Sequence, residues 1–321
     1  MSEENKKTEK IRELLDSQQL ETYDFREEIV GFKGSDSIDR FFVYKALGIK
    51  LDGEGLGYEE AKRYVESETS EGSEGYEEKC EADNCTLAQA VYRCLWDEKH
   101  LVHCKDSGDT MNSCFMTFAE YLKPLVDGLE MTIDCWKRAH WGNRKLFCLY
   151  YEHKKRMTKL LEPARGFLNV AYTIGNLIPV PAGCNGPRGI GPTRDYWDLA
   201  LLNVYQWYKD RDDAKLKDML RNRGEEVRPY VKLYIEWLDS FGSWDRFVIA
   251  NYMQDFVKKA DPEEDAGIFG FPRELWDGHF DGAPLPVTHE QCNAFFSRTA
   301  KYISARSVRM VSALRTKENI E

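Results

Sequence analysis

Polar side chains that could hold a ligand crowd into one apolar stretch, residues 169–202, which reads NVAYTIGNLIPVPAGCNGPRGIGPTRDYWDLALL. An asparagine amide donates and accepts at once, an arginine guanidinium fits a carboxylate or a phosphate, and an aspartate accepts from several donors. Burying such groups unpaired would cost about 1–3 kcal/mol each, so we expect them either to satisfy loop backbone groups or to point at a ligand. The candidates are Thr173, Asn176, Asn185, Arg188, Asp195 and Asp198.

Proline and glycine determine the local structure of this stretch. Proline lacks the N–H and glycine is under-constrained, so neither a helix nor a regular strand can run through it. A rigid loop between packed elements is a common place for binding residues. We therefore predict a central loop over residues 172–198 that enters a buried helix at its end. The residues concerned are Pro179, Pro181, Gly183, Gly186, Pro187, Gly189, Gly191 and Pro192.

Cysteine and histidine side chains before residue 105 have the spacing of a metal site. His100 and Cys104 are four residues apart, so on a helix they share one face, and Cys80 and Cys85 precede them. Four such ligands could hold a structural zinc ion. The chain has nine cysteines at irregular spacing, which favours reduced thiols in a reducing compartment, so ordinary thiols are the alternative.

The last predicted helix, from about residue 288 to 314, carries a basic stripe. Arg298, Lys301, Arg306 and Arg309 fall on one face at about 100° per residue. On an acidic protein this stripe predicts a contact with nucleic acid, with an acidic partner or with the chain's own acidic segment. Intramolecular pairing and solvation are the alternative.

Charge and hydropathy limit the class of protein. A formal net charge of −10 argues against a broad, non-specific grip on DNA or on an anionic membrane. No apolar run reaches the roughly 18 residues of a membrane span. The first residues, MSEENKKTEKIRELL, lack the apolar core of a secretory signal, so we expect a cytoplasmic protein.

The elements that must position these side chains are mostly helical. Periodic apolar residues predict helices at 4–18, from Thr86 to about 104, at 113–127, 129–140 and 227–241, and after 244. Thr288-x-x-Gln291 predicts a capping box for the last helix. We expect a mainly α, multi-helix globular domain with a small β element around 145–182. The predicted units are an α-rich segment 1–66, an acidic linker or surface insertion 67–84, and a main helical domain 85–321.

Two strings resemble an uncharacterised bacterial family, known as a domain of unknown function. YTIGNLIPVP with the later DYWDLAL is the first, and GDTMNS at 108–113 is the second. The resemblance covers roughly residues 100–310. It implies a bacterial or phage intracellular protein in which Asp109, Thr110 and Asn112 face the same pocket as Thr173 and Asn176.

A second resemblance is to the HNH-type nuclease segment of modification-dependent restriction enzymes. The chain offers Glu152–His153 after the apolar run 145–151, then TIGNL, then Asn185. The resemblance implies that His153 is a general base toward water and that Glu152 and Asn185 hold one divalent ion, Mg²⁺ or Mn²⁺. The chain departs from that pattern at 154–156, which reads KKR where the family has two apolar residues and proline. The alternative is that His153 is a surface residue of a basic helix.

Recognition and catalysis therefore remain two separate hypotheses. The first is an intracellular bacterial or phage protein, in defence or mobile-element biology, that recognises a ligand or a protein partner through the 172–198 loop. The second is a metal-dependent HNH-like nuclease. The sequence leaves open whether the chain is an enzyme and which cofactor it uses.

Overall fold

The computed structural model of the chain describes the ranges that follow. They are residues 3–28, 36–38, 40–41, 82–112, 117, 121, 153–184, 196–219, 228–263, 267–282 and 285–318. The predicted helix 129–140 and the apolar run 145–151 lie outside these ranges, as does nearly all of the predicted helix 113–127.

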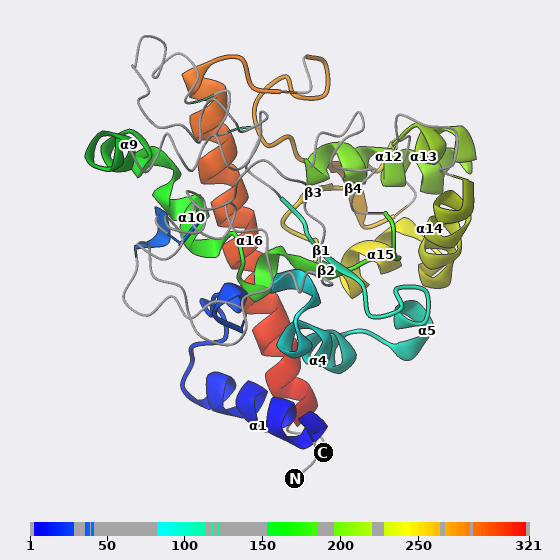
Figure 1. Ribbon diagram of the computed structural model, residues 1–321. Helices are drawn as coiled ribbons and strands as arrows, with labels where there is room; N and C mark the ends of the chain where they lie inside the picture. Colours follow the sequence, from blue (N-terminus) through cyan, green and yellow to red (C-terminus); the bar gives the residue numbers. More distant parts are fainter. Residues whose placement is uncertain are drawn as a thin grey trace, which may run out of the picture.

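Helices make up most of the described chain, and two small antiparallel sheets lie among them (Figure 1). The α-helices are α1 (Glu3–Asp16), α4 (Thr86–Leu95), α5 (Glu98–Leu101), α9 (Lys154–Leu160), α10 (Arg165–Val170), α12 (Trp197–Asp210), α13 (Asp213–Met219), α14 (Arg228–Phe241), α15 (Trp244–Ala250) and α16 (His289–Glu318). The 3-10 turns are η1 (Phe25–Glu28), η2 (Ala82–Asn84), η3 (Glu162–Ala164) and η4 (Ile174–Asn176). The prediction of a mainly α fold with a small β element is confirmed.

The long helix α16 passes through the middle of the molecule, with the other elements arranged around it (Figure 1). The predicted capping box begins it, because Thr288 Oγ1 accepts from the Gln291 N–H at 3.2 Å and Gln291 Oε1 accepts from the Thr288 N–H at 3.3 Å. Its buried residues recur every three or four positions and face η3, η4, α4 and α10. They are Cys292, Phe295, Phe296, Thr299, Ile303, Arg306, Ser307, Met310, Val311 and Leu314.

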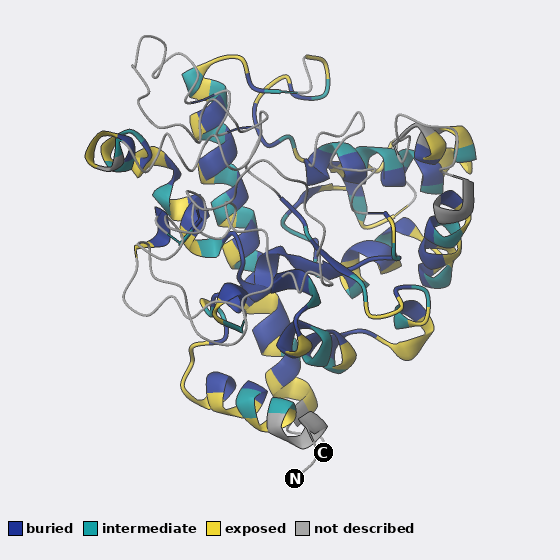
Figure 2. Cartoon of the chain, viewed as in Figure 1, coloured by how far each residue is buried: buried dark blue, intermediate teal, exposed yellow. Residues whose placement is uncertain are grey.

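The first sheet joins two segments that are far apart in the sequence. β1 (Gly108–Thr110) pairs antiparallel with β2 (Leu177–Pro179), and Asp109 lies opposite Ile178. The pairing continues past β1, because the Met111 N–H donates to the Asn176 carbonyl at 2.6 Å. Both strands are buried except at Thr110, which is intermediate, and Figure 2 shows them mainly in the colour of buried residues. The two strings that carry the family resemblance therefore lie side by side in the core.

The second sheet is a hairpin further along the chain. β3 (Val257–Lys259) pairs antiparallel with β4 (Phe269–Pro272), with an irregular register between Val257 and Lys259. β4 contacts α12 and α15, so the hairpin places the residues after Pro272 beside the start of α12.

Two predicted helices end earlier than expected. The helix from Thr86 stops at Leu95, because Trp96 turns to an extended backbone and donates its indole N–H to Asn251 Oδ1 at 3.0 Å. The helix after residue 244, whose predicted apolar face included Tyr252 and Phe256, stops at Ala250, and Tyr252 takes a positive φ of 57°. Both breaks occur where a tertiary contact overrides local helix propensity.

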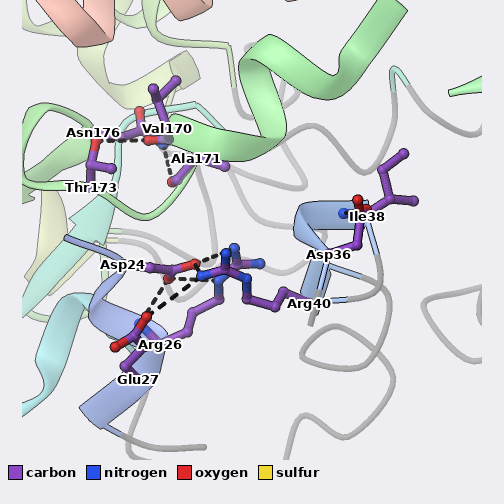
Figure 3. A network of polar contacts seen from close by, with 10 residues as sticks. All are labelled: Asp24, Arg26, Glu27, Asp36, Ile38, Arg40, Val170, Ala171, Thr173 and Asn176. Atoms are coloured by element: carbon purple, nitrogen blue, oxygen red, sulfur yellow. Dashed lines mark hydrogen bonds and ion pairs between the residues drawn. The ribbon is translucent and has the colours of Figure 1, made fainter. Parts of the chain in front are cut away.

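The N-terminal segment contacts the central stretch at Tyr172. Figure 3 shows Arg26 donating to both carboxylate oxygens of Asp24, at 2.8 and 2.6 Å. The Arg26 guanidinium, held in this way, lies 4.6 Å from the Tyr172 ring centroid. The Phe25 N–H donates to the Tyr172 carbonyl at 3.0 Å. The proposed units 1–66, 67–84 and 85–321 stay predictions, and residues 67–81 lie outside the described ranges. Within those ranges, no helix has the length and apolar content to cross a bilayer.

Candidate functional site

Asn176 connects two segments through all of its side-chain atoms. Its Oδ1 accepts from the Asn112 N–H at 3.0 Å, and its Nδ2 donates to the Asn112 carbonyl at 3.2 Å and to the Ala171 carbonyl at 2.7 Å (Figure 3 draws the last bond). The side chain is fully buried. Asn176 therefore extends the β1–β2 pairing by mimicking a backbone amide, which is an architectural role.

The neighbouring candidates are buried as well, but they play different parts. Thr173 Oγ1 donates to the Val170 carbonyl at 3.0 Å, so it satisfies the end of α10. Asp109 is buried on β1. Asn112 has its main chain held by Asn176, and its Oδ1 accepts from the Trp197 N–H at 3.4 Å, at the start of α12. The structure thus brings the 108–112 string, the 172–180 string and the first turn of α12 together.

Asp198 holds a histidine from a distant segment. Its Oδ2 lies 2.6 Å from Nδ1 of His279 and also accepts from the Leu275 N–H at 2.9 Å. Its Oδ1 accepts from the Leu199 N–H at 2.9 Å. The side chains of Asp198 and His279 are 1 % and 0 % exposed. A carboxylate oxygen in this position accepts a proton-bearing nitrogen, so the neutral imidazole carries its hydrogen on Nδ1 and its lone pair on Nε2.

A short turn after β4 positions the imidazole. Glu274 accepts from the N–H of Gly278 at 3.4 Å and from that of Phe280 at 2.8 Å, which fixes the backbone on both sides of His279. Gly278 has a φ of +76°, in the left-handed region that favours glycine. Leu275 joins this turn to Asp198, so the loop and the carboxylate are positioned together.

Aromatic rings enclose the imidazole. Trp276 stacks on it with centroids 3.5 Å apart and planes at 26°. Tyr196 meets it edge-on at 5.2 Å and 88°, and the Tyr196 hydroxyl shares a 2.7 Å hydrogen bond with Thr117 Oγ1. Trp276 therefore covers one face of the imidazole, and Nε2 is the ring nitrogen that does not bond to Asp198.

Nothing in the described part of the chain contacts that nitrogen with a hydrogen bond. Nε2 of His279 is buried and has no partner there. A buried polar atom left unsatisfied costs about 1–3 kcal/mol. The group is also oriented by a carboxylate, as a general base or a ligand-binding imidazole would be. This combination makes the Asp198–His279 pair the candidate site.

The predicted zinc ligands have other contacts. Cys85 Sγ accepts from the Ala88 N–H at 3.4 Å and caps α4, and Cys104 Sγ donates to the His100 carbonyl at 3.7 Å. His100 lies with Nδ1 2.7 Å from Ser240 Oγ and stacks on Phe241 at 4.0 Å. Within the described ranges, no three His, Cys, Asp or Glu side chains gather as metal ligands would. Cys80 lies outside those ranges.

Little of the predicted nuclease arrangement falls on described residues. His153 is half-buried at the N-terminal end of α9. Glu152 and Asn185 lie outside the described ranges, as do Arg188 and Asp195 of the ligand-binding set. The HNH-like reading therefore stays a prediction.

The basic stripe on α16 is not the surface that the sequence predicted. Arg306 is fully buried and donates to the carbonyls of Asn251, Gly175 and Leu177 at 2.8–2.9 Å. Burial lowers the pKa of Arg306 to about 9, so the guanidinium is still charged at neutral pH. The expectation that Arg306 lies on the surface was wrong. Its guanidinium has several N–H donors, which can bond to buried carbonyl groups inside a core in place of water.

The other members of the stripe remain nearer the surface. Arg298 pairs with Asp277 at 2.7 Å and Arg309 with Asp255 at 2.6 Å, while Lys301 is exposed. Two of the three therefore take part in intramolecular ion pairs.

His279 was not predicted as a site residue. It lies in the string Trp276–Asp277–Gly278–His279, before the last predicted helix. The Asp-Gly dipeptide there predicts a tight turn, and an imidazole beside a large aromatic residue in such a turn was the available signal.

Comparison of the chain with protein-family models, with curated proteins and with solved structures finds no match.

Proposed function

We propose that the chain binds a small polar ligand at the Asp198–His279 pair, which lies at the end of the 172–198 segment. The observation that carries the proposal is the buried Nε2 of His279, which has no hydrogen-bond partner among the described residues. In the neutral imidazole that donates from Nδ1 to Asp198, Nε2 is an acceptor, so the ligand must supply an O–H or N–H donor. In this proposal, Asp198 is the residue of the 172–198 loop that takes part, and the ligand binds to Nε2 of the imidazole that Asp198 holds.

Enclosure argues for a small molecule rather than a protein surface. The imidazole lies against Trp276 and Tyr196 and is 0 % exposed, so a flat partner surface could not reach its edge. Small-molecule sites are commonly lined by aromatic side chains with a few placed polar groups. The arrangement of His279 fits that description.

A thermal-shift screen tests the proposal. The full chain is screened against alcohols, amides, sugars and nucleosides that carry a hydrogen-bond donor, beside two variants. His279→Phe keeps an aromatic ring on Trp276 and removes both nitrogens. Asn203→Ala removes a single hydrogen bond, from Nδ2 to the Leu199 carbonyl at 2.7 Å, on the same helix.

We expect at least one compound to raise the melting temperature of the wild-type chain and of Asn203→Ala, but not that of His279→Phe. A shift that persists undiminished in His279→Phe would overturn the proposal. So would a screen in which no donor-bearing compound stabilises the wild-type chain.

A further inference from the structure

A second unsatisfied group lies at the same turn of α12 as the Asp198–His279 pair. Asn112 is 2 % exposed, and its Nδ2 has no hydrogen-bond partner among the described residues. Asn112 Oδ1 accepts from the Trp197 N–H at 3.4 Å. Because the amide nitrogen could not accept that hydrogen, this contact sets the orientation of the amide group, and Nδ2 is the donor without a partner among the described residues.

The main chain of Asn112 is fixed, so this donor is pre-positioned. Asn176 holds the Asn112 N–H at 3.0 Å and its carbonyl at 3.2 Å. The Asn112 side chain bonds to Trp197, and the His279 side chain bonds to Asp198, which is the next residue of the same helix. A donor and an acceptor, both buried and both unsatisfied, therefore flank one helical turn.

The charge at this turn selects the kind of group that Asn112 would bind. The first turn of a helix presents N–H groups and favours electron-rich oxygen. Asp198 already places a carboxylate there, and a second anion beside it would be repelled. A neutral carbonyl oxygen satisfies Nδ2 without that repulsion.

We infer that Asn112 and His279 together select a ligand in which a carbonyl oxygen adjoins an N–H, that is, a carboxamide, a lactam or a ureide. The carbonyl accepts from Asn112 Nδ2 and the N–H donates to His279 Nε2. This inference rests on the proposed function, since it assigns the ligand class of the same site. It makes Asn112 a specificity-determining residue.

A titration of the ¹⁵N-labelled full chain with three five-membered ring compounds tests the inference. 2-Pyrrolidone carries both groups, cyclopentanone carries the carbonyl alone, and cyclopentanol carries a hydroxyl. The two readouts are the side-chain amide resonance of Asn112 and the imidazole Nε2 resonance of His279. We expect 2-pyrrolidone to shift both resonances saturably, with an apparent Kd about tenfold below that of either other ring.

A variant separates the two groups. Asn112→Asp keeps an oxygen for the Trp197 N–H and removes the donor, so it should weaken 2-pyrrolidone about tenfold while cyclopentanol still shifts the His279 resonance. If that variant does not fold, the wild-type resonances decide alone. Movement of the His279 resonance without the Asn112 resonance would overturn the inference and leave the proposed function standing. A titration that moves neither resonance would overturn both.

Discussion

Asp198 Oδ2 lies 2.6 Å from Nδ1 of His279, a residue 81 positions later in the chain, and both side chains are buried. The carboxylate also accepts from two backbone N–H groups, of Leu199 and Leu275. One side chain therefore fixes the start of α12, the turn after β4 and the orientation of the imidazole.

Replacing that carboxylate should be costly. Asp198→Asn puts an amide nitrogen against a donor, and we expect a loss of about 2–4 kcal/mol in the free energy of unfolding, measured with urea. Asp239→Asn is the matched control, because Asp239 is 56 % exposed in its pair with Arg211 and should cost less than about 1 kcal/mol. Equal effects of the two substitutions would contradict the role of Asp198.

The close approach of η4 to α16 requires glycine at position 175. A Cβ there would lie 2.1 Å from the Ile303 carbonyl oxygen and 2.3 Å from Ser307 Oγ. We expect Gly175→Ala to cost about 3 kcal/mol or more, seen as a lower urea midpoint or as loss of folded protein.

Gly166 provides the control for that substitution. It lies exposed in α10, and a Cβ there would meet nothing within 4 Å. Gly166→Ala should stabilise the chain by about 0.5–1 kcal/mol through helix propensity. A tolerated Gly175→Ala would mean that η4 does not pack against α16 as described.

The amide of Asn176 should contribute more than an ordinary side-chain hydrogen bond. Asn176→Ala leaves buried groups of Asn112 and Ala171 without partners, so we expect a loss of about 2–4 kcal/mol. Asn203→Ala removes a single bond and should cost about 1 kcal/mol. Calorimetric or urea unfolding of both variants measures the two losses in the free energy of unfolding. Similar losses would contradict the role of the Asn176 side chain in joining Asn112 to Ala171.

His100 should make stability depend on pH. Burial lowers the pKa of His100 from 6.5 to about 4, so between these values the unfolded chain binds more protons than the folded chain. The contribution of His100 to the free energy of unfolding is therefore fully present above pH 6.5 and is lost as the pH falls toward 4. We expect wild type to lose about 1–2 kcal/mol more than His100→Gln between about pH 7 and about pH 5 in urea unfolding. Identical pH profiles of the two proteins would refute this assignment.

Features determined by neighbouring residues were predictable. The capping box at Thr288 and Gln291 begins α16, and the apolar periodicity of residues 227–241 gives α14. The sequence also indicated that Asn176 and Asp198 make specific hydrogen bonds, because polar groups in an apolar loop need partners. Their partners proved to be inside the protein, which composition alone could not distinguish from a ligand.

Features determined by distant residues were not predictable. Arg306 was predicted to be part of a surface stripe because it shares a helical face with Arg309. The carbonyl groups that accept its hydrogen bonds belong to η4, β2 and Asn251, which are distant in the sequence. His279 could be paired with Asp198 only once the β3–β4 hairpin had placed the following turn beside α12. The early end of α4 likewise depends on Asn251, which lies 155 residues from Trp96.

The protonation of the His279 ring tests the central claim most directly. Long-range ¹H–¹⁵N correlation spectra of the labelled chain near neutral pH, with His279→Phe to assign the resonances, show which nitrogen carries the hydrogen. We predict that Nδ1 carries the hydrogen and that a bare Nε2 responds to donor-bearing compounds. A hydrogen on Nε2 in the neutral ring would contradict the account, because Asp198 would then not hold the imidazole in the orientation that the site requires.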